Sequence, residues 1–416
     1  MSDLRLNLVS PMPTTDHWRS AGFSRIVFWE PCVSPHKSAF ISAVAERFGP
    51  DVTVYCVAHE GVPQARQALG WTDGCAVLHH TVVAPDDALI DALIDEGGQD
   101  CLHVFSGIRW FSTLTHALAR VKRQRCRFAL MLEPRDNAGW KGALRFIQSY
   151  LTEAWLRRRV QFVLAIGRHG SPWFRSVGYA ADRMFPFAYF LPSPHAVLDD
   201  HNARADDAHT PDPDASDYGT GVVHTRGTRR KIEVAYVGRL IQLKGVHHLL
   251  RAIATVSPHA RLTLIGDGER GDALVREAHE LSIDAEFSGV LPIGEVQRRM
   301  REFDVLALPS LTKDGWGAVV SEALLAGTAV IASSCTGASI LLDDARNGRI
   351  VAPGDSEAIA EAISDLERCG LLTPDARVRR MRWAAARLTA QAGASYFEQI
   401  VHHRLEGSSR PMEFYR

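Results

Sequence analysis

From residue 23 onwards, apolar runs of strand length alternate with stretches of helical spacing. The strands expected in the N-terminal half are 25–29, 51–57, 101–105, 127–132 and 162–166. The helices expected between them are 35–48, 87–95, 111–123 and 142–159. Alternation of this kind is typical of a parallel sheet whose strands are connected by crossover helices. The pattern therefore predicts an α/β domain over residues 23–192.

The composition changes over residues 193–231, which are rich in Asp, His, Pro, Gly and Thr and poor in large apolar side chains. Such a stretch is typical of a linker or a disordered insert. Strand and helix patterns resume at Ile232, so we expect a second α/β domain over 232–385. The remaining residues, 386–416, would form a helix at about 395–404 and a tail. Residues 1–22 lack the alternation and are expected to form a loose N-terminal arm.

Length and charge exclude several classes of protein. The 416 residues are enough for two domains of ordinary size. A formal net charge of -1 argues against nucleic-acid binding through an overall positive charge. The 7 cysteines are scattered and form no Cys-x-x-Cys pair, which favours reduced thiols in the cytosol over disulfides or a zinc site. No long uncharged apolar run predicts a membrane span, and the polar N-terminus is unlike a secretory signal.

Two carboxylates stand eight positions apart in the segment Asp314-Gly-Trp-Gly-Ala-Val-Val-Ser-Glu322. Asp314 lies in a Gly-rich loop, and Glu322 lies at the start of an apolar helix that would end at Gly327. Open α/β sheets bind ligands at such loops, beyond the carboxyl ends of their strands. Structural roles fit as well, because Glu322 could complement the helix dipole and Asp314 could cap the helix.

Four blocks in which a strand runs into a turn precede this segment. They contain Val-Ala-Tyr-Val-Gly238-Arg239, Leu-Thr-Leu-Ile-Gly266-Asp-Gly268, Ala-Glu-Phe-Ser-Gly289-Val-Leu and Phe-Asp-Val-Leu-Ala-Leu-Pro309-Ser310. In this order, and followed by the acidic segment, they resemble the donor-binding half of the retaining GT-B glycosyltransferases of glycosyltransferase family 4. The resemblance covers roughly residues 233–355 and is looser over the N-terminal half. It implies two Rossmann-like parallel-sheet domains facing a cleft, with a C-terminal helix that crosses back to the N-terminal domain.

The resemblance also implies roles for the charged residues of the second domain. Arg239 and Lys244 would bind the donor phosphates, although a solvated basic loop is the alternative. Glu322 would accept hydrogen bonds from the ribose. Asp314 matches an acid near the transferred sugar that is usually Glu in the family, so its shorter side chain is a departure. The turn at 266–268 would be structural and not a dinucleotide site.

Other donor contacts are implied by position. The amides of 315–317 would face the sugar and phosphate, with Trp316 where the family often has Phe. The turn at Gly289 would pass the base, and Ser310 would donate to a phosphate, while a core turn and a plain strand-end serine remain open. The expected donor-binding residues are Gly238, Arg239, Lys244, Gly289, Val290, Ser310, Gly315, Trp316, Gly317 and Glu322.

Acceptor and cleft candidates lie in the first domain. Ser34, His36 and Lys37 occupy the loop where the family often has Gly-Gly. We expect Ser34 to cap the following helix, with Pro35 in its first position, and the other two residues to face the cleft or solvent. His103 matches the first half of a family His-x-His pair, and a packed strand histidine is the favoured alternative.

Glu133, at the end of the strand 127–132, could orient an acceptor hydroxyl or form a salt bridge with Arg135. The candidates for catalysis are Asp314, Arg239, Lys244 and Glu133.

Residues 140–159 are both aromatic and basic. Leu144, Ile147, Leu151 and Ala154 share helical spacing, which predicts a face packed in the core. The side chains on the other faces fit an alternative in which this helix meets an anionic membrane. They are Phe146, Tyr150, Trp155 and the arginines 157–159, and Trp140 lies at the start of the same segment.

The expected activity follows from the resemblance. It is transfer of a sugar, with retention of configuration, from a nucleoside diphosphate sugar to an acceptor hydroxyl in glycan, polysaccharide or glycolipid biosynthesis. The resemblance implies neither a cofactor nor a metal. The expected location is the cytoplasm, with a peripheral position on the inner face of the membrane as an option. The alternatives are a non-catalytic nucleotide-sugar-binding protein and an epimerase-like hydrolase of the same fold.

Overall fold

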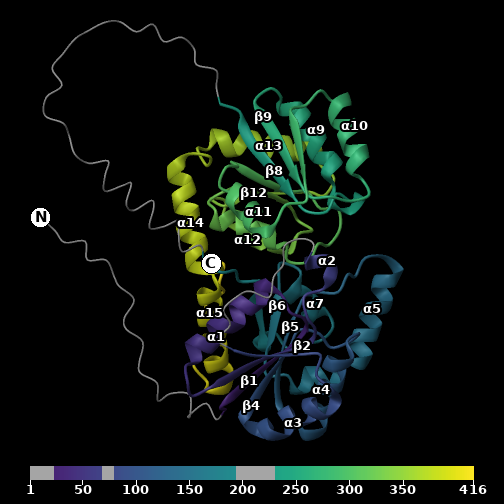
Figure 1. Ribbon diagram of the computed structural model, residues 1–416, viewed down its shortest axis with the longest axis vertical. Helices are drawn as coiled ribbons and strands as arrows, with labels where there is room; N and C mark the ends of the chain where they lie inside the picture. Colours follow the sequence, from purple (N-terminus) through teal and green to yellow (C-terminus); the bar gives the residue numbers. More distant parts are fainter. Residues whose placement is uncertain (1–22, 68–78, 194–229) are drawn as a thin grey trace, which may run out of the picture.

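The computed structural model describes residues 23–67, 79–193 and 230–416 (Figure 1). These residues form two α/β domains, one above the other in the figure, with the last two helices running along one side of both. The expected arm at 1–22 and nearly all of the expected insert at 193–231 lie outside the described residues.

The N-terminal domain contains a seven-stranded parallel sheet in the order β3-β2-β1-β4-β5-β6-β7. Its strands are β1 (Arg25–Cys32), β2 (Thr53–Glu60), β3 (His80–Val83), β4 (Cys101–Phe105), β5 (Arg127–Leu132), β6 (Val163–Ile166) and β7 (Met184–Phe187). Its helices are α1 (Pro35–Phe48), α2 (Gln64–Gln67), α3 (Asp87–Gly97), α4 (Ser112–Gln124), α5 (Gly139–Thr152), α6 (Ala154–Arg159) and α7 (Gly170–Ser176). Helices cover both faces of the sheet, which is why its central strands are continuous apolar runs.

The C-terminal domain contains a six-stranded parallel sheet in the order β10-β9-β8-β11-β12-β13. Its strands are β8 (Ile232–Val237), β9 (Ala260–Ile265), β10 (Ala285–Gly289), β11 (Val305–Leu308), β12 (Ala329–Ser333) and β13 (Gly348–Val351). Its helices are α9 (Val246–Val256), α10 (Gly271–Glu280), α11 (Ile293–Arg299), α12 (Ala318–Leu325) and α13 (Ser356–Arg368), with 3-10 turns η4 (Gln242–Lys244) and η5 (Gly337–Asp343). The strand order reverses between β8 and β11, and in the other domain between β1 and β4.

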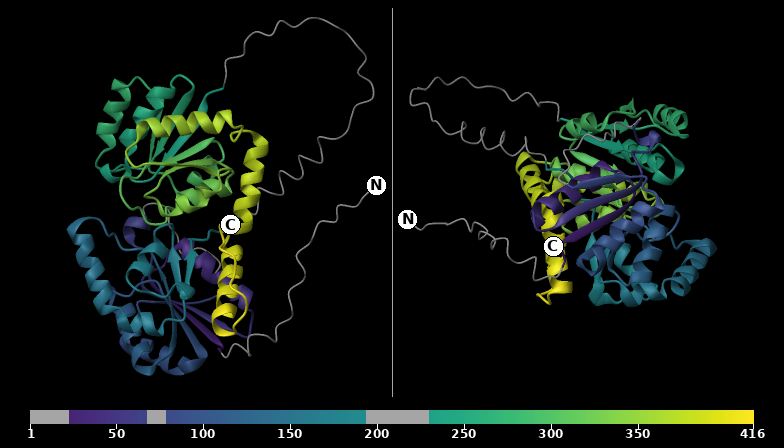
Figure 2. Two further views of the ribbon diagram at one scale, coloured as in Figure 1. Left: turned by 180° about the vertical axis from the view of Figure 1, so that it is seen from behind. Right: turned by 60° about the horizontal axis from the view of Figure 1, so that its bottom comes forward.

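Two C-terminal helices tie the domains together (Figure 2). Helix α14 (Pro374–Leu388) belongs to the C-terminal domain, where Arg380 donates to the carbonyl of Gly327 at 2.6 Å. Helix α15 (Ala390–Leu405) packs on α1 of the N-terminal domain, where Glu398 pairs with Arg47 at 2.6 Å and Phe397 contacts a cluster of phenylalanine rings. The chain therefore crosses back to its first domain, as the resemblance implied.

The domains also meet through their backbones. The amide of Arg168, after β6, donates to the carbonyl of Gly337 at 2.9 Å, and its guanidinium bonds to Ser339 and Asp343. A Cβ atom at Gly167 would lie only 2.9 Å from the Cα atom of Gly337. This approach holds the carboxyl ends of the two sheets against each other.

The helix expected at 142–159 is two helices, so that prediction was wrong. The break falls at Glu153, which is buried and accepts hydrogen bonds from Arg109 at 2.8 Å and from the Tyr179 hydroxyl at 2.9 Å. Satisfying this buried carboxylate fixes the local backbone outside the helical range. Among the described residues, no helix combines the length and apolarity that crossing a membrane requires.

Candidate active site

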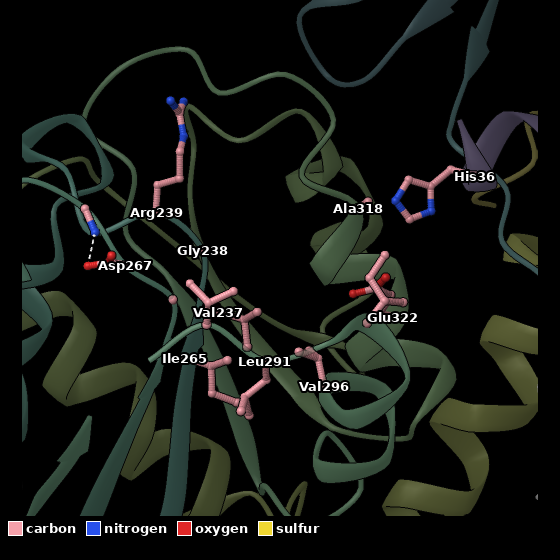
Figure 3. A pocket seen from close by; sticks show the side chains of 14 residues that line it. His36, Val237, Gly238, Arg239, Ile265, Asp267, Leu291, Val296, Ala318 and Glu322 are labelled. Carbon is pink, nitrogen blue, oxygen red and sulfur yellow. Dashed lines mark hydrogen bonds between the residues drawn. The ribbon is translucent and has the colours of Figure 1, made fainter. Parts of the chain in front are cut away.

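A cavity of about 520 Å³ lies at the carboxyl ends of β8, β9 and β10 (Figure 3). Helices α11 and α12 close one side, and α1 of the other domain contributes one side chain. Its lining residues are His36, Val237, Gly238, Arg239, Ile265, Gly266, Asp267, Gly268, Val290, Leu291, Ile293, Val296, Ala318 and Glu322. The position is that of ligand sites in open α/β sheets, beside the point where the strand order reverses.

Glycines make one wall of this cavity by letting the loops touch through their backbones. A Cβ atom at Gly266 would lie 2.0 Å from the carbonyl oxygen of Gly238, and one at Gly268 would lie 2.5 Å from that of Leu240. The amide of Gly266 donates to the carbonyl of Gly289 at 2.7 Å. The sequence assigned the turn at 266–268 a structural role only, and the structure makes it part of the cavity wall.

The deeper part of the cavity is apolar. Val237, Ile265, Leu291 and Val296 gather there in Figure 3, and Val290 adds an exposed edge. An apolar slot next to exposed backbone suits a flat heterocyclic ring, which needs contact on its faces and polar partners at its edge.

Arg239 and Glu322 occupy opposite sides of the cavity (Figure 3). The loop of Arg239 is fixed by the Tyr236 hydroxyl, which donates to the Arg239 carbonyl at 2.8 Å, while its guanidinium is exposed at the rim. Glu322 projects from the middle of α12, not from its start as expected. Burial raises the pKa of the Glu322 carboxyl to about 7.

A second polar cluster lies next to the cavity, where the loops after β8 and β11 meet. Lys244 Nζ contacts Asp314 Oδ2 at 2.5 Å, and the Ser310 hydroxyl donates to the same oxygen at 2.9 Å. Asp314 does not cap α12, whose N-cap is Gly317. Ser310 is buried and bonded to Asp314 in this structure, so it positions the carboxylate.

Glu133 reaches this cluster from the N-terminal domain. It accepts hydrogen bonds from the amide of Trp316 at 3.0 Å and from the Tyr189 hydroxyl at 2.8 Å. A Cβ atom at Gly315 would lie 2.6 Å from Glu133 Oε2, so a larger residue there would push the carboxylate away. The alternative role, a salt bridge with Arg135, is not formed, because the Arg135 guanidinium donates to Ser149, Gln148 and the Arg145 carbonyl.

Trp316 does not present its ring to the cavity. The indole is 1% exposed and donates to the Ser321 hydroxyl at 3.0 Å. Its contribution to the cleft is therefore its backbone amide.

His36 faces the cavity from α1 and lies beside Glu322 in Figure 3. Burial, with a smaller contribution from Arg66, lowers the pKa of His36 to about 4, so the ring is neutral at ordinary pH. Pro35 is at the start of α1 as expected, but the Ser34 side chain makes no capping hydrogen bond, so that prediction was wrong.

Lys37 is held by hydrogen bonds where the strand order of the N-terminal sheet reverses, between β1 and β4. Its ammonium donates to Glu30 at 2.8 Å and to Ser106 at 2.7 Å, and Ser106 donates to the other oxygen of Glu30 at 2.7 Å. Glu30 is 1% exposed, so this cation neutralises a buried carboxylate. Lys37 also lies 5.9 Å from the centre of the Tyr189 ring, which connects the cluster to Glu133.

His103 does not reach the cleft. It is fully buried in β4, accepts from the Trp29 indole at 3.2 Å, and its pKa is lowered by burial to about 3. Its assignment as a cleft residue was wrong, and the packed strand histidine is what the structure contains.

The family of the second domain follows from a direct comparison. Residues 231–368 match the family model described as "Glycosyl transferases group 1". The C-terminal domain is a glycosyl transferases group 1 domain.

Curated relatives resemble part of the chain. A glycogen synthase of Mycobacterium tuberculosis is 33% identical over 188 residues, covering 43% of this chain and 44% of the relative. The lipopolysaccharide core biosynthesis glycosyltransferase LpsE of Rhizobium meliloti is 34% identical over 137 residues, covering 32% of this chain and 38% of the relative. The chain thus spans less than half the length of these relatives.

Solved structures show that the likeness of fold extends over both domains. HepE of Anabaena, in complex with UDP, superimposes with a TM-score of 0.64 over 90% of this chain and 98% of its own, at 17% identity. The lipopolysaccharide outer core galactosyltransferase WaaB superimposes with a TM-score of 0.64 over 91% and 99%, at 14% identity. The expected GT-B fold, with two Rossmann-like domains facing a cleft, is confirmed.

Beside the group 1 domain, the structure brings in residues that the sequence analysis missed. Glu30, Ser106 and Tyr189 come from three separate strands or loops of the first domain. A polar residue at the end of an apolar strand was the only signal that could have found Glu30 and Ser106. In the described ranges, no group of three or more His, Cys, Asp or Glu side chains is arranged to hold a metal ion.

Proposed function

We propose that this protein transfers a sugar from a nucleoside diphosphate sugar to an acceptor hydroxyl. The observation that carries the proposal is the pairing, across one cavity, of a half-buried carboxylate at Glu322 with an exposed guanidinium at Arg239. A ribose needs an acceptor of hydrogen bonds, and a diphosphate needs cations. The apolar slot and the glycine wall between them supply the space for a base.

The donor would lie along this line of groups. The base would enter the slot formed by Ile265 and Leu291, and the ribose hydroxyls would donate to Glu322. The diphosphate would then run toward Arg239 and Lys244. In support, structures with the same fold have been solved with UDP and with UDP-glucose, as HepE of Anabaena has.

The transferred sugar would lie at the Asp314 cluster, between the domains. As the bond from the anomeric carbon to the diphosphate oxygen breaks, negative charge grows on the leaving diphosphate. Lys244 and Arg239 would stabilise that charge. We infer retention of configuration: the acceptor oxygen would bond on the face that the diphosphate leaves, and its proton would pass to the departing phosphate.

The acceptor would enter from the N-terminal domain. Glu133 touches the loop of Gly315 and Trp316 from that side and is exposed, so its free lone pairs could orient an acceptor hydroxyl. His36, neutral at ordinary pH, would contribute a polar edge next to the ribose site. By the same proposal the protein acts in the cytoplasm in glycan, polysaccharide or glycolipid biosynthesis and is peripheral to the membrane.

A product assay tests the function. The protein is incubated with a panel of nucleoside diphosphate sugars and simple hydroxyl acceptors, and nucleoside diphosphate release and glycosylated product are measured by mass spectrometry. Glycosylated acceptor with the anomeric configuration of the donor is the expected result. A free epimerised sugar would favour an epimerase-like hydrolase, and binding with no turnover in any combination would favour a non-catalytic binder.

A further inference from the structure

Helix α5 carries its apolar face on the outside of the protein. Trp140, Leu144, Ile147 and Leu151 follow one another at spacings of four, three and four, which places them on one stripe of the helix. Their exposed fractions run from 51% for Ile147 to 70% for Trp140. Helical spacing predicted that Leu144, Ile147 and Leu151 pack in the core, and that prediction was wrong.

The opposite face of α5 explains why the apolar stripe is outside. Its buried residues are small or polar: Gly142, whose absent Cβ atom leaves room for the backbone of Asn137, and Ser149. Arg135 donates to the Ser149 hydroxyl at 2.9 Å, and Arg157 donates to its carbonyl at 3.2 Å. Hydrogen bonds thus hold the helix to its domain, and the apolar stripe is left uncovered.

Exposed apolar surface is concentrated here. Thirteen large hydrophobic side chains are exposed in the described part of the chain, and six of them lie on α5. Figures 1 and 2 show α5 at the outer edge of the N-terminal domain, with no other element outside it. A patch of this kind marks a surface that binds something.

A further exposed indole stands at the C-terminal end of α5. Trp110 is 88% exposed and has a φ of 76°, a left-handed conformation that costs energy for a bulky residue. Its neighbour Arg109 donates to Thr152 and to Glu153, which fixes the loop beside the helix end. The strained backbone of Trp110 therefore lies in a loop that exposes the indole ring to solvent.

The charges around the stripe indicate which kind of partner binds this face of α5. Residues 139–159 contain five basic side chains and a single acidic one, Glu153, which is buried and bonded. In the part of the chain that the structure describes, no carboxylate lies within ion-pair distance of Lys141, Arg158 or Arg159. Apolar residues with indoles, flanked by unpaired cations, match the boundary between acyl chains and anionic headgroups. A protein partner of ordinary composition would not need this one-sided charge.

We propose that the exposed face of α5 docks the protein on a bilayer that contains anionic lipid. The loop that precedes α5 reaches the cleft. In this loop Glu133 contacts the Trp316 amide, and Asn137 contacts Lys313 of the other domain. Docking through α5 would therefore hold the mouth of the cleft at the membrane surface. This deepens the proposed function and rests on it in one respect: it implies that the acceptor is presented at a lipid surface.

Vesicle co-sedimentation of the full chain tests the docking face without any donor. The probes are vesicles of phosphatidylcholine alone and vesicles of phosphatidylcholine with phosphatidylglycerol. Binding to the anionic vesicles at low salt, and release at high salt, is expected, because exposed charges are screened. The triple variant Leu144→Gln, Ile147→Gln, Leu151→Gln should lose at least about tenfold in partitioning, since three apolar side chains leave the interface.

Matched controls separate docking from general stickiness and from misfolding. Leu89→Gln and Met412→Gln also replace exposed apolar side chains, on α3 and on the C-terminal tail, and should leave vesicle binding unchanged. Lys141→Glu with Arg158→Glu should abolish the preference for anionic vesicles. Affinity for the nucleotide-sugar is measured on every variant and should be unchanged. This measurement separates a failure of membrane docking from a failure of the proposed donor site.

Three results would overturn the proposal. They are equal binding of the wild type to both kinds of vesicle, undiminished binding of the triple variant, and concentration-dependent self-association that the triple variant loses without any vesicle binding by the wild type. The last result would make α5 an interface between copies of this chain.

Discussion

Lys244 and Asp314 form an ion pair, with 2.5 Å between Nζ and Oδ2, that joins the loops after β8 and β11. Ser310 holds the same carboxylate oxygen at 2.9 Å. A donor diphosphate would compete with Asp314 for the lysine. By the proposed function, the carboxylate would restrain the lysine until a donor binds, so the two residues should have opposite effects on donor binding.

Lys244→Ala and Arg239→Ala should each weaken donor binding by about 1.5–3 kcal/mol, the usual value of a charged hydrogen bond. Isothermal titration with the nucleoside diphosphate measures the loss. Lys231→Ala is the matched control, because Lys231 lies at the opposite end of the same sheet and is exposed. Unchanged affinity in both site variants would contradict the phosphate assignment.

Asp314→Asn should lower turnover while leaving affinity for the nucleoside diphosphate unchanged or tighter. The neutral amide no longer holds Lys244, so the diphosphate displaces nothing when it binds. The measurement compares steady-state turnover with the dissociation constant of the diphosphate. A loss of diphosphate affinity as large as that of Lys244→Ala would show that Asp314 belongs to the phosphate site itself.

Glu322 should make donor affinity depend on pH. Burial raises its pKa to about 7, and ribose hydroxyls donate to the ionised form, so affinity should rise with pH up to about 7 and then level off. Below that pH it should fall by up to about tenfold per unit. The titration runs between about pH 5.5 and 8.5, which is above the pKa of His36. The ligand is a nucleotide-sugar, because the phosphate diesters of the nucleotide-sugar do not titrate in this range.

The raised pKa of Glu322 should have the opposite effect on the stability of the protein. The folded protein holds the Glu322 proton at pH values where the unfolded chain has released it, so the free energy of unfolding should fall as pH rises from about 4.5 to about 7. Glu322→Gln should remove both dependences and bind the donor more weakly at pH 8. A pH profile of this variant identical to that of the wild type would sink the assignment.

Gly266→Ala should destabilise the fold severely, because the new Cβ atom would lie 2.0 Å from the Gly238 carbonyl oxygen at a φ of 138°. Gly49→Ala provides the control: its φ is 67°, but nothing lies within 4 Å of the added atom. The control should cost about 1–2 kcal/mol, the price of the left-handed conformation alone. Urea unfolding compares the two, and an equal loss would contradict the close packing of the loops after β8 and β9.

Much of the fold could be predicted from the sequence because the central strands are buried on both faces. The expected ranges 35–48, 101–105 and 127–132 coincide with α1, β4 and β5. Strand β3 was missed because it is a short, mostly exposed edge strand without a continuous apolar run. The break at Glu153 was missed because its cause, bonds to Arg109 and Tyr179, lies far along the chain.

The candidate site could be predicted where residues lie in the loops that follow β8 and β11, or on the helix after the second loop. Arg239 and Glu322 line the cavity, and Lys244 and Asp314 lie beside it. Which polar groups bond to one another could not be predicted, because that depends on contacts between distant segments. Periodicity placed Leu144, Ile147 and Leu151 on one stripe, which lies on α5, but it could not tell whether that stripe faces the core or the outside of the protein.

The most direct test of the central claim is a thermal-shift panel of nucleoside diphosphate sugars on the wild type, Arg239→Ala and Glu322→Gln. A ligand at about 100 times its Kd adds about 2.7 kcal/mol of apparent stability. The account predicts that at least one nucleotide-sugar raises the Tm of the wild type by several degrees and that both variants lose most of that shift. No shift with any nucleotide-sugar, or an equal shift in all three proteins, would contradict a donor site in this cavity.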